Sequence, residues 1–178
     1  MIKGIIGAIL AVGAVHGENK ESCMQEYEIV QKPAMKIVGI ECRVSNRSDS
    51  APVLIPKHWE KFYKEGISGK IPNKASEEVI ALYCDYEGDY TKPYSLVIGC
   101  PVTAVDQVPK GMVVKTVPAS TFAVYKATGE FPKSIVDTWG RVWSSASLKR
   151  TYTGDYELYG EKFTAGEVDV LVAIEATR

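Results

Sequence analysis

Histidine and cysteine are scarce in this chain of 178 residues, which has two histidines and four cysteines. None of the cysteines shows the CxxC spacing of a structural zinc site, so we expect no bound metal. A phosphate-binding loop, a dinucleotide fingerprint and a Gly-x-Ser-x-Gly elbow are also missing from the sequence. The sequence therefore predicts no cofactor, and it offers no nucleophile with an adjacent base.

An excess of charge of one sign is lacking as well, because 21 lysines and arginines are balanced by 22 aspartates and glutamates. The resulting net charge of −1 gives no electrostatic reason to expect nucleic acid as a direct partner. The content of 46% hydrophobic and 24% charged residues is typical of a globular protein. The length allows one ordinary domain and excludes two large ones.

A long apolar run opens the chain, where Lys3 precedes an uncharged stretch from Gly4 to Val15. About a dozen apolar residues are short for a membrane span but match the hydrophobic region of a secretory signal. We therefore expect residues 1–25 to be a leader, formed by a signal peptide and a short tail, with export to the periplasm if it is cleaved. After its removal no stable membrane insertion is expected. The alternative is a cytoplasmic protein that keeps this N-terminal segment.

The cysteines are compatible with both settings. In an exported protein, Cys23, Cys42, Cys84 and Cys100 could form one or two disulfides. In the cytoplasm, the last three would be small buried residues inside strands. Their number alone does not choose between the two settings.

Two halves of the sequence after the leader show the same order of elements. In each half, a long strand carries a Pro-Ala pair, a helix with an apolar face follows, and two further strands close the unit. The expected elements are strands at 27–44, 79–86 and 94–105 around a helix that begins at His58 and ends near Gly66 or Gly69, and strands at 112–126, 152–159 and 168–176 around a helix that opens at 129–132. The tripeptide Asp85-Tyr86-Glu87 recurs as Asp155-Tyr156-Glu157.

This repetition predicts an α+β fold of duplicated β-α-β-β units, with an antiparallel sheet and two helices around a central cleft. The repeats extend over residues 27–105 and 112–176, within one domain of residues 26–178. The seam between the two halves is a natural place for a ligand. Trp143, at the end of the second helix, is expected in the core.

One acid stands out inside the strand at 152–159. Strand alternation places Thr153, Asp155, Glu157 and Tyr159 on one face. A mid-strand acid normally faces solvent, and that is the simplest interpretation of the pattern alone. The alternative is a single anion on the floor of an aromatic pocket, which would attract a cationic organic guest. Its counterpart Glu87 borders a turn and is expected to stay outside.

Several fragments in a fixed order carry a resemblance to a known family. They are Trp59-Glu60-Lys61-Phe62, Tyr83-Cys84-Asp85-Tyr86, Tyr94-Ser95-Leu96-Val97-Ile98-Gly99, Pro109-Lys110-Gly111-Met112, Val117-Pro118-Ala119 with Phe122-Ala123-Val124-Tyr125, Trp139 with Trp143, and Gly154-Asp155-Tyr156-Glu157-Leu158-Tyr159. Together they resemble the GyrI-like small-molecule-binding domain, also known as the AraC-type effector-binding domain, in a stand-alone form. The resemblance extends over residues 27–176.

The resemblance implies a duplicated β-α-β-β fold and a cleft that binds hydrophobic, often cationic compounds, as multidrug-binding proteins do. Carried over residue by residue, Glu157 would lie at the base of the cleft, and Trp59, Tyr83, Trp139 and Tyr159 would line it. Family members often carry a helix-turn-helix before this domain. The leader is too short and too apolar to be one, so direct transcriptional regulation is not expected.

Two other functions remain as alternatives. Some stand-alone members of the family are similar to hydrolases that open strained rings, which would make Glu157 a catalytic group assisted by a tyrosine. In an interaction module, the aromatic residues would instead form an interface. Non-enzymatic binding of a small organic ligand is favoured, because the sequence shows no catalytic pair beyond this acid and its tyrosines.

Overall fold

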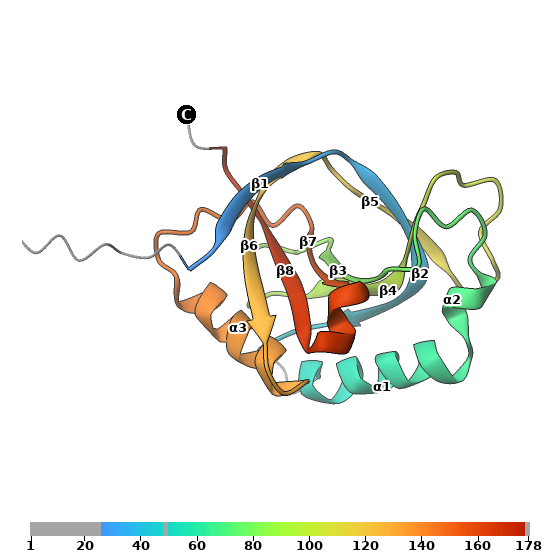
Figure 1. Ribbon diagram of the computed structural model, residues 1–178, viewed down its shortest axis with the longest axis horizontal. Coiled ribbons are helices and arrows are strands. Elements are labelled where there is room, and N and C mark those ends of the chain that lie inside the picture. Colours follow the sequence, from blue (N-terminus) through green and yellow to red (C-terminus); the bar gives the residue numbers. More distant parts are fainter. Residues whose placement is uncertain (1–25, 48–49, 177–178) are drawn as a thin grey trace, which may run out of the picture.

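The computed structural model describes residues 26–47 and 50–176, and its strands follow the runs of β-branched and aromatic residues. The strands form one antiparallel sheet of eight strands that curls into a half-barrel (Figure 1). Their bounds are β1 Glu28–Lys32, β2 Met35–Val44, β3 Val79–Cys84, β4 Tyr94–Val102, β5 Val113–Val117, β6 Ser120–Thr128, β7 Asp155–Tyr159 and β8 Glu167–Ile174. An α+β fold with an antiparallel sheet is therefore confirmed.

The order of strands in the sheet is β1-β6-β8-β7-β3-β4-β2-β5. The order is symmetric about the central β7–β3 pair. Outward from β7 follow β8 and β6, and outward from β3 follow their counterparts β4 and β2. The two strands that were expected to be continuous each break at a proline, Pro33 or Pro118. Proline interrupts a strand ladder, so each long strand divides into a short and a long piece. Each short piece pairs with a strand of the other half: β1 with β6, and β5 with β2.

The helices begin at other residues than the sequence patterns predicted. The first helix, α1, extends over Ala51–Lys64 and has a proline in its first turn, where the missing N–H costs nothing. Pro52 was therefore the start signal, and Pro56, which was expected to precede the helix, lies inside it. The short α2 (Ile67–Lys70) follows, then α3 (Lys133–Ser144), and a 3₁₀ turn, η1 (Glu161–Ala165), replaces part of the expected loop after β7.

Strand β7 is three residues shorter than expected. Tyr152 has a positive φ of 55°, a conformation that an extended strand does not tolerate. The strand therefore starts at Asp155, although the predicted alternation of faces holds from that residue on. Register pairs Glu157 with Ala81 and Asp155 with Tyr83 on β3.

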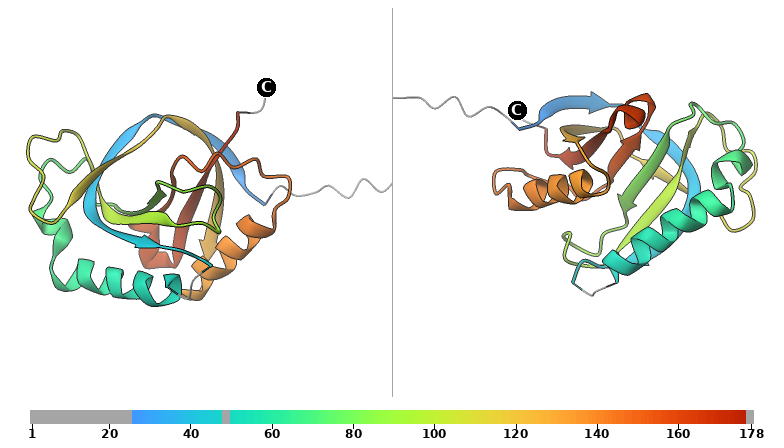
Figure 2. Two further views of the ribbon diagram at one scale, coloured as in Figure 1. Left: turned by 180° about the vertical axis from the view of Figure 1, so that it is seen from behind. Right: turned by 60° about the horizontal axis from the view of Figure 1, so that its bottom comes forward.

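Helices α1 and α3 lie on the same side of the sheet (Figure 2). One apolar core fills the space between them and the sheet, and a second core lies on the other face, inside the curl. Helix α1 packs on β2 and β4, whereas α3 packs on β6 and β8. The central strands β3 and β7 therefore run beneath the seam between the helices.

The described residues also bear on the predictions about membrane insertion and the cysteines. None of the helices within 26–47 and 50–176 is long and apolar enough to cross a membrane. Cys42, Cys84 and Cys100 are free thiols in strands. Cys23 and the predicted leader lie outside the described residues.

Candidate functional site

The side chain of Glu157 is buried beneath the seam between the helices, with only 1% of the residue exposed. Three hydrogen bonds hold its carboxylate. The Tyr83 hydroxyl and the Trp139 indole N–H donate to Oε1, each over 2.7 Å, and the Tyr159 hydroxyl donates to Oε2 over 2.6 Å. The acid is thus inside the molecule, and the solvent-facing interpretation is wrong.

All three donors to Glu157 are neutral. Within the described part of the chain, no lysine, arginine or histidine forms an ion pair with this carboxylate. Burial raises the pKa of the Glu157 carboxyl, and its hydrogen bonds to Tyr159, Trp139 and Tyr83 offset part of that rise. Burial and the nearby carboxylate also raise the pKa of Tyr83 and Tyr159, which keeps both hydroxyls protonated as donors.

A second buried acid, Asp155, lies two residues earlier on the same face of β7. Its side chain is fully buried, and Oδ2 forms an ion pair of 2.6 Å with Arg150, whose side chain is 5% exposed. The Tyr86 hydroxyl donates to Oδ2 over 3.0 Å, and the backbone N–H of Ala173 donates to Oδ1 over 2.8 Å. Asp155 therefore has a cation of its own inside the protein.

Aromatic rings surround the two acids and continue to the surface. The Trp59 ring lies edge-on to Tyr159, with 4.9 Å between ring centroids, and stacks on Tyr63 at 5.7 Å. Phe131, in the turn before α3, lies 6.2 Å from Tyr159 between ring centroids. Tyr63 and Phe131 are 62% and 47% exposed. A continuous aromatic path thus connects solvent with the ring that binds Glu157.

The structure brings together all five residues that were expected at the site. Tyr83, Trp139 and Tyr159 contact Glu157 directly, while Trp59 lies one ring farther out. The repeat counterpart Glu87 is exposed and pairs with Arg43, as expected for a residue beside a turn. The positions agree with the expected site, whereas a role in binding remains a proposal.

Other residues near the site were missed or misplaced. Trp143, expected in the core, is 41% exposed and stacks on Tyr90 at 5.5 Å. His58 does not begin the helix but lies inside it, buried against the Ile40 carbonyl. Arg150 gave no signal, because it lies in a loop without periodicity. Asp155 could have been found, since alternation already placed it on the face of Glu157.

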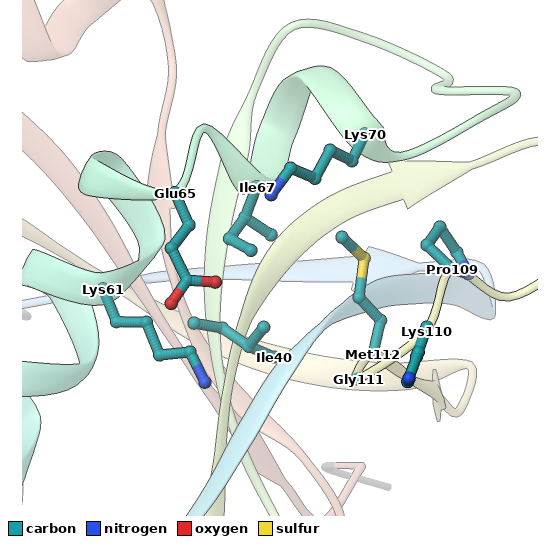
Figure 3. A pocket seen from close by; sticks show the side chains of 9 residues that line it. All are labelled: Ile40, Lys61, Glu65, Ile67, Lys70, Pro109, Lys110, Gly111 and Met112. Carbon is teal, nitrogen blue, oxygen red and sulfur yellow. The ribbon is translucent and has the colours of Figure 1, made fainter.

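Two cavities open elsewhere on the protein, and Glu157 lines neither of them. The larger, of about 600 Å³, is bordered by Tyr159 and by five carboxylates with one lysine (Glu77, Glu78, Glu161, Glu167, Asp169 and Lys162). The smaller, of about 390 Å³, lies at the α1–α2 junction and contains three lysines (Figure 3). Tyr83, Trp139 and Tyr159, which bind Glu157, are themselves buried and cover the acid.

Comparison with known proteins identifies the family of the chain. Residues 28–174 match the family model described as "Cass2: Integron-associated effector binding protein". The chain belongs to the Cass2 family. Since Cass2 is a GyrI-like family, the resemblance inferred from the sequence fragments is confirmed.

Relatives with known names support this assignment. The Cass2-family chain is 26% identical over 147 residues to the transcriptional-regulator-like protein YobU of Bacillus subtilis, covering 79% of this chain and 92% of YobU. It is 28% identical over 157 residues to the transcriptional regulator BrlR of Pseudomonas aeruginosa, covering 82% of this chain and 54% of BrlR. The chain thus aligns with only about half the length of BrlR.

Solved structures show the same architecture. The integron cassette protein VCH_CASS2 of Vibrio cholerae is 27% identical, with a TM-score of 0.67, and the match covers 85% of this chain and 97% of that protein. The protein SAV2435, solved bound to tetraphenylphosphonium, has a TM-score of 0.71 at 19% identity, over 85% of this chain and 94% of that one. The likeness to SAV2435 is one of fold.

Proposed function

We propose that this Cass2-family protein binds hydrophobic organic cations at Glu157, between the aromatic residues of the two helices. The observation that carries the proposal is the buried carboxylate whose hydrogen-bond donors are all neutral. A buried charge without a counter-ion is unfavourable, and a cationic ligand would supply the missing partner. The tetraphenylphosphonium bound to the structural neighbour SAV2435 is a ligand of this chemical class.

Ligand entry must displace rings, because the site is filled without a ligand. Trp59 is only half-buried and leans on the exposed Tyr63, so these two rings can rotate away with little loss of core packing. The rings then offer their faces to the cation, and each desolvated cation–π contact contributes about 2 kcal/mol. The acidic cavity beside Tyr159 favours the approach of cations to this side of the molecule.

Calorimetric titration with three ligands of related shape tests the proposal. Tetraphenylphosphonium, the neutral triphenylphosphine oxide and the anionic tetraphenylborate separate charge from apolar contact. We expect binding in that order, and a loss of about 10- to 100-fold for tetraphenylphosphonium in Glu157→Gln, since a charge pair some 8 Å apart contributes about 2 kcal/mol. Glu87→Gln, which changes the exposed counterpart, is the matched control and should bind normally.

The outcomes of this titration are distinct. Equal affinity of wild type and Glu157→Gln for tetraphenylphosphonium would refute a role for this acid. Tighter binding of tetraphenylborate than of the cation would refute the ligand class. Turnover of a strained-ring substrate by wild type, and not by Glu157→Gln, would instead support the hydrolase alternative, for which the raised pKa of Glu157 is the favouring observation.

We also propose that the protein is exported and that its two halves arose by duplication. The apolar run that follows Lys3 supports export, and N-terminal sequencing of protein recovered from the periplasm would test it. The symmetric strand order supports duplication. Superposing β2 to β4 on β6 to β8 in an experimental structure should require a rotation near a half-turn.

A further inference from the structure

The smaller cavity lies apart from Glu157 and has the opposite charge. Its wall of nine residues comes from β2, the end of α1, α2 and the turn before β5 (Ile40, Lys61, Glu65, Ile67, Lys70, Pro109, Lys110, Gly111 and Met112). Figure 3 shows these side chains arranged around one hollow. Four separate segments of the chain therefore meet here, which fixes the shape of the cavity better than a single loop would.

The polar part of this wall is mainly cationic. Lys61, Lys70 and Lys110 stand against a single acid, Glu65. Across residues 26–47 and 50–176, none of these three lysines is paired with a carboxylate. By contrast, Lys64 and Lys133, which are also exposed, each pair with an acid of their own helix. The cavity thus keeps a net charge of +2 that no protein group neutralises.

The floor of the cavity is apolar. Ile40 and Ile67 are each 3% exposed and belong to the core, and Met112 lines the cavity beside them from the turn (Figure 3). Methionine is flexible and polarisable, so it adapts to ligands of different shape. A volume of about 390 Å³ falls in the lower part of the range for small-molecule sites. The occupant is therefore a small molecule with an apolar body.

We propose that this cavity binds an amphipathic organic anion, a carboxylate attached to a short aliphatic or aromatic body. The body covers Ile40, Ile67 and Met112, and the carboxylate meets the ammonium groups at the rim. The proposal does not depend on the function assigned to Glu157, because it uses other residues and a ligand of opposite charge. Together the two sites would let the protein bind a cation and an anion at once.

Glu65 provides a second test of the proposed anion site. Its carboxylate points into the same hollow as the lysines (Figure 3) and repels an incoming anion. Removing its charge should therefore tighten binding of the anion, whereas removing lysine charge should weaken it. Opposite effects from neighbouring residues are not expected from a general loss of folding.

The experiment is an NMR titration of the full chain with octanoate, with 1-octanol and octylammonium as ligands of equal length. We expect octanoate alone to shift the amide signals of Gly111 and Met112. The triple variant Lys61→Gln/Lys70→Gln/Lys110→Gln should bind octanoate about tenfold more weakly, because each exposed pair contributes about 0.2–1 kcal/mol. Glu65→Gln should bind it about two- to fivefold more tightly.

The matched control is Lys32→Gln/Lys36→Gln/Lys57→Gln, which removes the same charge from exposed lysines outside the cavity. It should bind octanoate like wild type. The proposal is overturned if both triple variants weaken octanoate binding equally. It is also overturned if 1-octanol binds as tightly as octanoate, or if the shifted signals centre on the Trp139 indole. Tetraphenylphosphonium affinity should stay unchanged in the cavity variant, so this site and the Glu157 site can fail independently.

Discussion

Asp155 and Glu157 are two buried acids on one face of one strand, and they differ in what neutralises them. Asp155 has the guanidinium of Arg150 at 2.6 Å. Glu157 has two phenol hydroxyls and an indole N–H. The first acid completes an ion pair inside the protein, while the second has no charged partner among the described residues. One strand face thus carries a paired acid and an unpaired one, and the unpaired acid is the one for which we propose a ligand.

The neighbouring rings reinforce this difference. Arg150 lies 4.4 Å from the centre of the Tyr152 ring and 6.0 Å from that of Trp139, so an aromatic cage around a cation already exists at Asp155. The Nε and Nη1 atoms of Arg150 have no hydrogen-bond partner, and the guanidinium carbon lies over the rings of Tyr90, Trp139 and Tyr152. A ligand cation at Glu157 would find the same kind of surroundings one step farther along β7.

The largest expected effect comes from breaking the internal pair. Asp155→Asn should destabilise the protein by about 3–5 kcal/mol, because Arg150 would stay buried without a counter-ion. Urea unfolding followed by tryptophan fluorescence measures this loss. Glu87→Gln, which breaks the exposed pair with Arg43, should cost at most about 1 kcal/mol. A loss at Asp155 as small as that at Glu87 would contradict the contrast between the two acids.

The opposite effect is expected at Glu157. Its pKa is raised in the folded state, so the folded protein binds more protons than the unfolded chain at pH values between the two pKa values. Stability contributed by this group is therefore present below the ordinary value of 4.5 and is lost as the pH rises toward the folded pKa. At pH 7, Glu157→Gln should therefore be more stable than wild type, because the variant carries no charge that burial disfavours.

Unfolding of wild type and Glu157→Gln between pH 4 and pH 8 measures this difference. Acids with a lowered pKa, such as Asp85, give the reverse slope at low pH, but they are common to both proteins and cancel. A difference that does not change with pH would show that Glu157 is not an uncompensated charge. Adding tetraphenylphosphonium should reverse the order of stability, because only wild type gains a counter-ion.

The smallest expected effect concerns the outer rings. Tyr63→Ala should change stability by no more than about 0.5 kcal/mol, because the side chain is exposed. It should weaken tetraphenylphosphonium binding about threefold, since an exposed cation–π contact contributes about 0.5–1 kcal/mol. Val136→Ala, an equally exposed position on α3, is the control and should alter neither quantity. Unchanged binding in Tyr63→Ala would restrict the site to the buried rings.

The sequence predicted the strands and the acid-bearing face well, because both follow from alternation over a few residues. The burial of Glu157 was only one of two interpretations of that pattern, and the family resemblance favoured it. Tyr83 lies 74 residues from Glu157 in the chain, so local patterns could not bring them together. Arg150 and Asp155 are only five residues apart, and their pairing was missed for a different reason, because a loop residue shows no periodicity.

Errors at the edges of elements had local causes. The break of the long strands was visible as Pro33 and Pro118, but their change of partner depends on strands from the other half. Tyr152 was counted in β7 because its residue type favours strands, whereas the Arg150 and Tyr86 contacts hold it in a turn conformation. Trp143 was expected in the core because its spacing fits the apolar face of α3, yet it lies at the exposed end of the helix beside Tyr90.

Strand β1 pairs with β6 and strand β5 pairs with β2, so backbone hydrogen bonds join the two halves at both edges of the sheet. Moving the two halves apart would break the backbone hydrogen bonds of both of these strand pairs. Space for a ligand would therefore come from rotation of side chains and from shifts of the helices over an unchanged sheet. If the protein binds ligands as proposed, ligands of different shape would be accommodated without a change in the sheet.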